Sequence, residues 1–420
     1  MLTLQAQDHP QLFDFAEFLG SSCARAWLVG GTVRDLLLGE QPADYDIAFC
    51  GDLSPEIRSW SRLRQGCWFW LDQERNQSRV LLEGGRLQFD FAPLRADTIL
   101  GDLRLRDFTL NAIALPMQQL TAGALIDPLG GVADLQSGNL RSCSADVLIS
   151  DPLRCLKGIR HHAQRGWEFT PETLGQIRAT ATLLNRVAGE RLRTELSRIL
   201  TAPHLTSAIR LLAETGLDRE LFPGFNESQF RVAIRQARKR LDTLAAFEPI
   251  RVQLEAECES LLPLQSLLIL ALIFSCTTTF NPESVERLRL SRRSSRLLDL
   301  LVNSEPARID LKADDSPRIS ALKLEQLGAE PVARLLFTLL QGQGAEPLSL
   351  YAAALARYDA QLRCGRVPDL LGGDILIGQC PTLSGKEIGV WLGKIKEAEI
   401  NGEISCDSEA EAWLKRQFSN

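Results

Sequence analysis

The sequence predicts an α+β protein, in which a head with a mixed β-sheet and helices precedes an elongated, all-helical neck, body and tail. Up to about residue 141, short strand-like runs alternate with helical runs. From there the apolar spacing is helical nearly to the end, for example over residues 151–165 and 188–200. This order of elements predicts a mixed head on a helical body.

The length of the chain allows several domains. At 420 residues it is long enough for two to four domains. Helix breakers near residues 222–224 and 303–306 indicate turns between helical segments. The expected domains are a head at 1–142, a neck at 143–225, a body at 226–366 and a tail at 367–420.

The composition is that of an ordinary globular protein. Hydrophobic residues make up 45% and charged residues 24% of the chain. The longest apolar run, residues 261–276, contains Pro263 and Gln265 and is too short to span a membrane, so we expect a buried helix and no membrane partner. The ten scattered cysteines form no CxxC pair, which together with the absence of a signal-like N-terminus favours a reduced, cytoplasmic protein. The net charge of −6 means that any RNA must be held by a local basic surface.

A glycine pair follows the first predicted strand. Residues 26–29 are apolar, Gly30 and Gly31 follow, and helical spacing begins at about Thr32. Glycines let backbone N–H groups approach a ligand closely, because no Cβ stands in the way. Unpaired N–H groups at a helix N-terminus and the helix dipole both favour phosphate. The segment therefore predicts a phosphate site.

Two aspartates, Asp44 and Asp46, lie at the next predicted strand. Residues two apart on a strand face the same side, so both carboxylates point at one spot. Paired carboxylates beside a phosphate site suit two Mg²⁺ ions, which promote in-line displacement at phosphorus. We therefore interpret Asp44 and Asp46 as catalytic metal ligands and infer nucleotidyl transfer.

Asp90 is the expected third catalytic carboxylate. Two metal ions need more ligands than two aspartates offer. Asp90 lies among apolar neighbours in residues 86–92, whose alternation of apolar and polar side chains is typical of a strand. The alternative is an edge-strand aspartate that caps a turn.

These motifs resemble the head of the polymerase-β-type nucleotidyltransferases, and more narrowly the class II tRNA nucleotidyltransferase and bacterial poly(A) polymerase family. Residues 102–112, 150–160 and 189–200 are similar to further motifs of that family, in family order. Residues 126–135 resemble its turn between head and neck, where we expect a structural role with Asp134 as a cap for the next segment. The resemblance is clear up to about residue 223.

The resemblance implies a nucleotide site made by head and neck. Arg106 would contact phosphates and Asp107 the ribose hydroxyl. Asp151, a natural N-cap before Pro152, would select the base of CTP or ATP together with Arg154. The implied nucleotide-binding residues are Gly30, Gly31, Arg34, Arg106, Asp107, Asp151, Arg154, Lys157 and Arg160. The alternative for Arg106 and Asp107 is an ion pair on a helix surface. The alternative for residues 151–160 is a capped surface helix whose basic side chains are solvated.

Three positions depart from the family pattern. Leu105 replaces an arginine, Ser150 replaces a glutamate, and Lys157 replaces the second arginine of the neck motif. The first departure means that whatever that arginine contributes is absent or relocated. The other two bear on base selectivity and leave the predicted fold unchanged.

The resemblance implies an enzyme that adds C to the 3′ end of tRNA from CTP. If the protein is a full CCA-adding enzyme, it also adds A from ATP. Residues 49–53 lack the basic stretch of bacterial poly(A) polymerases, which favours a tRNA nucleotidyltransferase. The link at residues 96–101 is short where full CCA-adding members have a flexible loop, which predicts a CC-adding specialist whose product a separate A-adding enzyme completes. The tail would contact tRNA. The alternatives are a poly(A) polymerase of the same family and a catalytically silent RNA-binding homologue.

Overall fold

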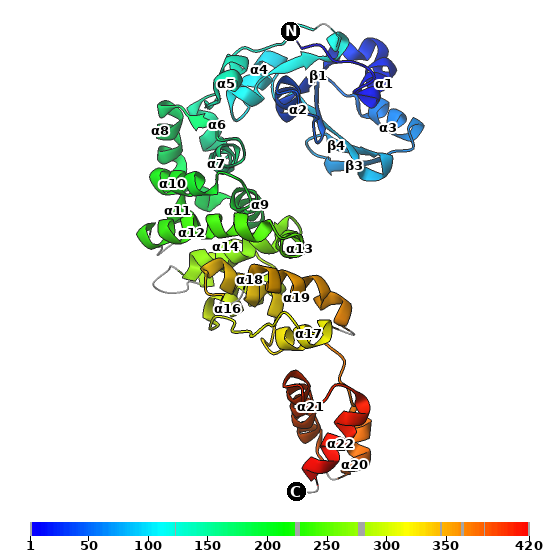
Figure 1. Cartoon of the computed structure of the whole chain (residues 1–420). Coiled ribbons are helices and arrows are strands. Elements are labelled where there is room, and N and C mark those ends of the chain that lie inside the picture. The colour runs from blue at the N-terminus through cyan, green and yellow to red at the C-terminus, as the bar shows by residue number, and fades with distance from the viewer. Residues whose placement is uncertain are drawn as a thin grey trace. The chain divides into compact units, whose positions relative to one another are not determined.

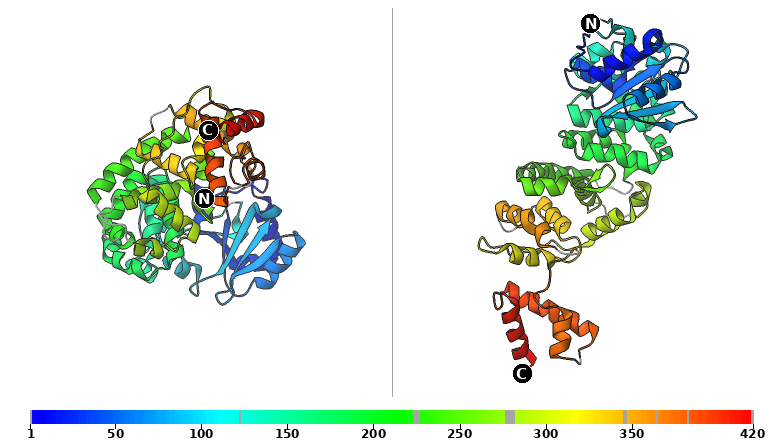
Figure 2. Two further views of the ribbon diagram at one scale, coloured as in Figure 1. Left: turned by 90° about the horizontal axis from the view of Figure 1, so that it is seen from below. Right: turned by 90° about the vertical axis from the view of Figure 1, so that its right-hand side faces the viewer.

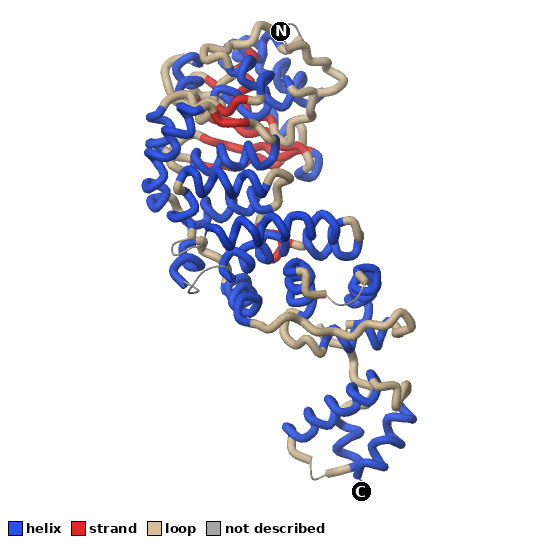
Figure 3. The backbone as a smooth tube through the Cα atoms, turned by 60° about the vertical axis from the view of Figure 1, so that its left-hand side comes forward, coloured by secondary structure: helices blue, strands red, loops and turns tan. Residues whose placement is uncertain are grey.

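The computed structural model describes residues 2–121, 123–222, 227–275, 282–344, 347–362, 365–381 and 383–418. The chain divides into two units, Met1–Pro223 and Gly224–Asn420, and each is described by itself below. The division into head, neck, body and tail is finer than this and stays a prediction. Strands gather in the first unit, and the second is almost entirely helical (Figure 1 and Figure 3).

A six-stranded mixed sheet forms the centre of the head, with strand order β3–β4–β5–β2–β1–β6. Its neighbours pair antiparallel except β2 and β5, which are parallel. The strands are β1 Ala26–Val29, β2 Tyr45–Phe49, β3 Cys67–Asp72, β4 Gln77–Leu82, β5 Leu87–Pro93 and β6 Ala114–Pro116. The mixed sheet expected from the sequence is thus confirmed.

Helices α1, Pro10–Leu19, and α3, Ser54–Leu63, cover one face of this sheet. Phe15 of α1 and Phe89 of β5 pack on Trp60 of α3, with ring centroids 4.6 and 5.1 Å from it. Successive strand residues point to opposite faces, so the neighbours of Phe89 in β5 point away from this core. Polar side chains are therefore free to gather on the other face. Helices α2, Gly30–Leu37, and α4, Ile99–Arg104, complete the head.

The turn at residues 126–135 leads from the sheet into the helical bundle of the first unit. The carboxylate of Asp127 accepts hydrogen bonds from the N–H groups of Gly131 and Val132, at 2.7 and 3.0 Å. It therefore satisfies the start of α5, Gly131–Ser137. The expectation that Asp134 caps the next segment is wrong: Asp134 lies inside α5, where it accepts from the Thr109 hydroxyl at 2.6 Å. The structural role expected for this motif is confirmed.

The rest of the first unit is a bundle of short helices. Helix α7 packs on α9 and α10, and its central Gly158 lies against the rings of Phe108 and Phe169, where no larger residue fits. These helices are α6 Ala145–Ser150, α7 Leu153–Arg165, α8 Pro171–Thr180, α9 Gly189–Leu200, α10 Leu205–Thr215 and α11 Leu217–Leu221. A short parallel pair, β7 Asn139–Leu140 and β8 Glu168–Phe169, lies among them.

The second unit is built of helices joined by turns, apart from the short pair β9 Glu257–Glu259 and β10 Leu262–Pro263 (Figure 2). Helix α14 is buried over nearly its whole length, which confirms the buried helix expected at the longest apolar run. No described helix is long and apolar enough to cross a membrane. The helices are α12 Glu227–Ala245, α13 Glu248–Glu255, α14 Leu264–Ser275, α15 Pro282–Arg287, α16 Arg292–Asn303, α17 Pro317–Glu325, α18 Pro331–Gln341, α19 Leu348–Gln361, α20 Gly373–Gln379, α21 Gly385–Ile400 and α22 Asp407–Phe418.

Candidate active site

The glycine turn joins β1 to α2 on the polar face of the sheet. Gly30 has φ +67°, a left-handed conformation that favours glycine. A Cβ added there would lie 3.1 Å from Nη1 of Arg106 and 3.2 Å from Oδ2 of Asp46. The missing side chain at Gly30 thus lets an arginine and an aspartate approach the turn together.

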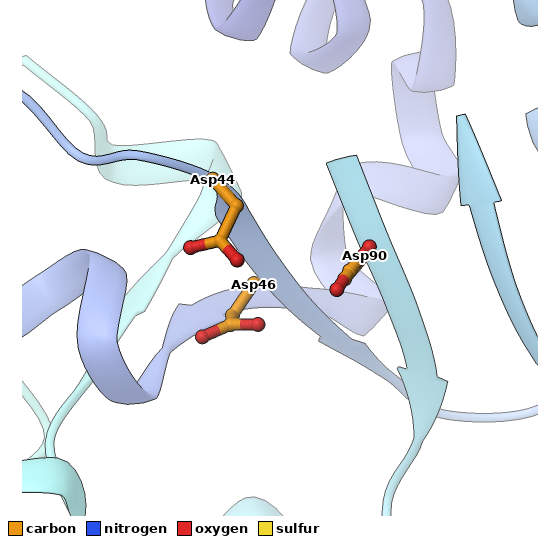
Figure 4. A group of neighbouring side chains, drawn as sticks. All are labelled: Asp44, Asp46 and Asp90. Atoms are coloured by element: carbon orange, nitrogen blue, oxygen red, sulfur yellow. The ribbon is translucent and has the colours of Figure 1, made fainter. Parts of the chain in front are cut away.

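Asp44 and Asp46 lie at the start of β2, as the sequence predicts. The Thr32 hydroxyl of α2 accepts a hydrogen bond from the Asp46 N–H at 2.7 Å and donates to the Asp44 carbonyl at 3.1 Å. This side chain therefore fixes the helix N-terminus against the strand. Figure 4 shows the side chains of Asp44, Asp46 and Asp90 extending from two neighbouring strands into one space.

The three carboxylates form a cluster that suits a cation. Each of Asp44, Asp46 and Asp90 offers an oxygen within 4.8 Å of the others. Burial, and then the charge of Asp44, raises the pKa of Asp46 to about 7. Burial, and then the charge of Asp90, raises the pKa of Asp44. Like charges held this close destabilise one another, and oxygen ligands of this kind fit hard divalent cations.

Asp90 belongs to a central strand. Strand β5 lies between β4 and β2, so the alternative of an edge-strand aspartate is wrong. Both carboxylate oxygens accept from Arg79 of β4, at 2.7 Å from Nε and 2.8 Å from Nη2. The Gln88 amide donates to Asp44 at 3.3 Å and to Asp90 at 3.4 Å. Arg79 and Gln88 were not predicted from the sequence, since strand register decides their placement.

Arg106 is held toward the glycine turn by a buried carboxylate. Asp102 of α4 is 1% exposed, and its Oδ2 accepts from Arg106 at 3.0 Å (Nε) and 2.9 Å (Nη2). This leaves Nη1 as the guanidinium group nearest Gly30. The sequence analysis did not assign a role to Asp102, although its spacing four residues before Arg106 is the spacing of a helical ion pair.

Asp107 lies in the same pocket and stays ionised. Burial raises the pKa of its carboxyl, but the charge of Lys157 and hydrogen bonds from Asn111 and Phe108 outweigh this and hold the pKa well below its usual range. The bonds to Oδ1 are 3.0 Å from the Asn111 amide and 2.8 Å from the Phe108 N–H. An ionised carboxylate is an acceptor only, as a ribose hydroxyl would require.

The guanidinium of Arg34 lies beside Gly31 of the glycine turn. It donates to Asp35 at 2.8 Å and to the Asn111 side-chain oxygen at 2.9 Å. Nη2 lies 3.6 Å from where a Cβ of Gly31 would be. Arg34 is not among the residues that line the cavity, although its partner Asn111 and the neighbouring Gly31 are, so its phosphate contact stays a prediction.

The neck residues Asp151 and Arg154 face the head site. Asp151 precedes α7 with a non-helical backbone, Pro152 is the first residue in helical conformation, and the Asp151 carbonyl accepts from the Arg154 N–H at 3.0 Å, so the predicted N-cap position is confirmed, although the Asp151 side chain makes no cap hydrogen bond. The Asp151 carboxylate instead accepts from Arg191 of α9 at 2.9 Å. Arg154 donates to the backbone carbonyls of Leu105 and Val147, each at 3.1 Å. The Asp151 carboxylate and the Arg154 guanidinium are therefore both held in place by tertiary hydrogen bonds.

The predicted basic stripe on α7 divides into two parts. Lys157 lines the pocket with Arg154. Arg160, one turn further on, does not line it and donates to the buried Glu195 of α9 at 2.7 Å. The Arg160–Glu195 pair joins two neck helices, and Arg191 replaces Arg160 as the third neck cation at the pocket.

One cavity of about 980 Å³ connects most of these groups, and of the three clustered aspartates Asp46 and Asp90 line it while Asp44 does not. Its walls come from the glycine turn and strands β2, β3 and β5 of the head, and from α7 and α9 of the neck. The charged residues that line it are Asp46, Arg75, Asp90, Arg95, Asp102, Arg106, Asp107, Asp151, Arg154, Lys157 and Arg191.

A carboxylate triad beside a glycine turn at a helix N-terminus and an arginine is the arrangement of a nucleotidyltransferase, and this is the class of the protein. Family models of a poly(A) polymerase head domain and of a probable RNA- and SrmB-binding site of polymerase A match residues 26–141 and 166–229. A CC-adding tRNA nucleotidyltransferase of Geobacter sulfurreducens is 33% identical over 93% of this chain and 92% of its own. The chain belongs to the class II tRNA nucleotidyltransferase and bacterial poly(A) polymerase family.

Two further comparisons agree in fold and in extent. A CC-adding tRNA nucleotidyltransferase of Synechocystis is 29% identical over 96% of this chain and 95% of its own. The structure of a Thermotoga maritima CCA-adding enzyme complexed with tRNA superimposes with a TM-score of 0.71 at 23% identity, covering 99% of this chain and 96% of that one. The likeness therefore extends over the helical part of the chain as well as the head.

Replacing Gly30 with Ala will lower kcat/KM for the nucleotide roughly 10- to 100-fold. The alanine must adopt a left-handed backbone conformation, and its Cβ crowds the side chains of Arg106 and Asp46. Small displacements of groups that position the substrate reduce the rate by factors of this size. Gly39→Ala is the matched control, because Gly39 has a similar left-handed backbone (φ +74°) but nothing lies within 4 Å of its added Cβ. Steady-state kinetics on both variants test this, and equal losses would contradict it.

Proposed function

We propose that this protein adds two C residues to the 3′ end of tRNA from CTP, releasing pyrophosphate, and that a separate enzyme adds the terminal A. The main support is the short link at residues 96–101, which passes from a bend directly into α4 at Ile99. No segment is left there for the flexible loop expected of a full CCA-adding enzyme. The relatives of Geobacter sulfurreducens and Synechocystis carry CC-adding names, whereas the equally well covered Thermotoga maritima structure is that of a CCA-adding enzyme, so the extension assay below must decide.

The proposed metal ions are Mg²⁺, held by Asp44 and Asp46 with Asp90 as a third ligand. The close approach of three carboxylate oxygens and the raised pKa of Asp46 fit a site that binds a divalent cation. When bound, the metal ions favour the deprotonated 3′-oxygen and neutralise charge on the departing pyrophosphate.

The chain's own residues bind and orient the substrates. The N–H groups of Gly30 and Gly31 would hold the triphosphate together with Arg106, whose Nη1 lies 3.1 Å from the position of a Gly30 Cβ. The ionised Asp107 would accept from the ribose hydroxyl, and Asp151 and Arg154 would offer an acceptor and donors to the base. Asp102 and Arg191 keep Arg106 and Asp151 aimed into the cavity.

The remaining assignments rest on the same proposal. Residues 1–142 would be the catalytic head, 143–225 the neck that recognises the base, 226–366 the body and 367–420 the part that contacts tRNA. Among the described residues, Cys23, Cys50, Cys67, Cys143, Cys155, Cys258 and Cys406 are free thiols, which fits the cytoplasmic setting expected from the scatter of the cysteines.

A single-nucleotide extension assay tests the proposal. Three tRNA transcripts, ending before CCA, after C and after CC, are each offered CTP alone, ATP alone and both nucleotides with Mg²⁺. We expect CMP addition that stops after the second C, and no AMP addition at any end. Completion to CCA would make the protein a full CCA-adding enzyme. Repeated AMP addition would favour a poly(A) polymerase, and binding without turnover would favour a silent RNA-binding homologue.

A further inference from the structure

An exposed apolar surface continues the polar face of the sheet beyond the carboxylates. It consists of Phe69 and Leu71 on the outer strand β3, and we call it the β3 platform. Phe69 is 36% and Leu71 47% exposed, although both are large apolar residues. Adjacent exposed apolar side chains at the edge of a polar site are one mark of a ligand-binding surface, and Leu71 also lines the cavity.

Strand register places the β3 platform in line with the catalytic residues. Phe69 pairs with Arg79, Arg79 with Asp90, and Asp90 with Asp46. Paired residues on neighbouring strands face the same side of a sheet. With strands about 4.8 Å apart, Phe69 lies about 10 Å from Asp90 across the sheet.

The opposite face of β3 is already occupied. Trp68 and Trp70 point away from the platform, and the guanidinium of Arg58 stacks on them, 4.0 and 5.1 Å from their ring centroids. A register irregularity follows Trp70, and Leu71 at that point lines the same cavity as Asp46 and Asp90. A bulge of this kind commonly re-aims a side chain near an active site.

The direction of the reaction identifies what covers the platform. In-line displacement places the attacking oxygen and the leaving pyrophosphate on opposite sides of the phosphorus. Gly30 and Arg106, which would hold the triphosphate, lie toward the β1 side of Asp46. The attacking 3′-OH must therefore approach from the β5–β4–β3 side, where the platform lies.

We propose that the β3 platform stacks the terminal base of the RNA that is being extended, an inference that rests on the proposed function. Recognition of single-stranded RNA ends relies on stacking on aromatic side chains. Arg75 and Gln77 line the cavity next to Leu71, and the exposed Arg75 is placed to contact the RNA phosphates. The incoming nucleotide is held by the glycine turn and the neck, so the platform acts on the RNA alone.

The test compares Phe69→Ala, Leu71→Ala and Phe69→Tyr with Phe18→Ala in the full chain. Phe18 is also 36% exposed, and it lies on α1, which packs on the other face of the sheet. For Phe69→Ala we expect KM for tRNA to rise about 5- to 100-fold, as loss of one stacked base implies. Leu71→Ala should show a smaller rise. KM for CTP should stay within about twofold of wild type, Phe69→Tyr should retain activity, and Phe18→Ala should match wild type.

A second readout does not depend on turnover. A tRNA transcript with 2-aminopurine as its last nucleotide is added to each variant without CTP. We expect the fluorescence to be quenched by stacking with wild type and Phe18→Ala, and to recover with Phe69→Ala. If wild type extends tRNA but Phe69→Ala behaves like Phe18→Ala in both assays, the role of the β3 platform is refuted and the proposed function stands. The same conclusion follows if Phe69→Ala raises KM for CTP instead of KM for tRNA. A wild type that extends no tRNA would refute the proposed function itself.

Discussion

Asp46→Asn and Asp44→Asn will each lower kcat for nucleotide addition by about 10³-fold or more while leaving the protein folded. Both side chains lie within reach of one metal site, and metal ions contribute several kcal/mol to transition-state stabilisation, at about 1.36 kcal/mol for each factor of ten. Asparagine keeps the shape of the side chain but removes the negative charge that holds the cation. Single-turnover extension of tRNA with CTP measures the loss.

The fold of these variants can be tested through pH. The pKa of Asp46 is raised to about 7 in the folded protein from an ordinary 3.8, so the folded state favours the protonated form. Wild type therefore loses stability as pH rises from about 4 through 7, whereas Asp46→Asn does not. At pH 8 without metal we expect the melting temperature of Asp46→Asn to equal or exceed that of wild type.

A matched control separates charge at the site from charge in general. Asp146 is an exposed carboxylate in the first turn of α6 and does not line the cavity. Asp146→Asn should keep full activity. An active Asp46→Asn would refute the metal assignment, and an unfolded one would show that the carboxylate has a structural role.

The sequence was most informative where a function depends on residues close together in the chain. The strand before Gly30, the helix after it and the spacing of Asp44 and Asp46 are local patterns, and the structure places them as expected. The place of Asp90 in the same cluster was also predictable, because the alternation of side chains along a strand decides which face of the sheet Asp90 lies on.

The partners of these residues could not be predicted in the same way. Arg79 meets Asp90 through the pairing of two strands, and Arg191 of α9 meets Asp151, which lies 40 residues earlier in the sequence. Residue spacing on α7 placed Arg160 beside Lys157, but the buried Glu195 on α9 holds it away from the cavity. Tertiary contacts of this kind leave no periodic signal in a single sequence.

Gly131→Ala will destabilise the first unit by about 3 kcal/mol or more, the largest effect that we expect of a single methyl group. Its Cβ would lie 2.7 Å from the carbonyl carbon of Thr109, closer still to the carbonyl oxygen, and 3.0 Å from Cγ1 of Ile113. Backbone cannot rotate away as a flexible side chain does, and overpacking of a well-packed core costs about 1–3 kcal/mol or more. Urea unfolding, monitored by a spectroscopic signal from the first unit, measures the change in the free energy of unfolding.

The same substitution at Gly175 is the control for helix propensity. Gly175 lies exposed in α8 with nothing within 4 Å of its added Cβ, so Gly175→Ala should stabilise the protein by about 0.5–1 kcal/mol. Opposite signs for two Gly→Ala changes in helices of one unit would show that steric contact decides the effect at Gly131. Because Thr109 follows Asp107 by two residues, a shift of its backbone also moves the proposed ribose-binding carboxylate, and we expect Gly131→Ala to lose activity even under conditions where it remains folded.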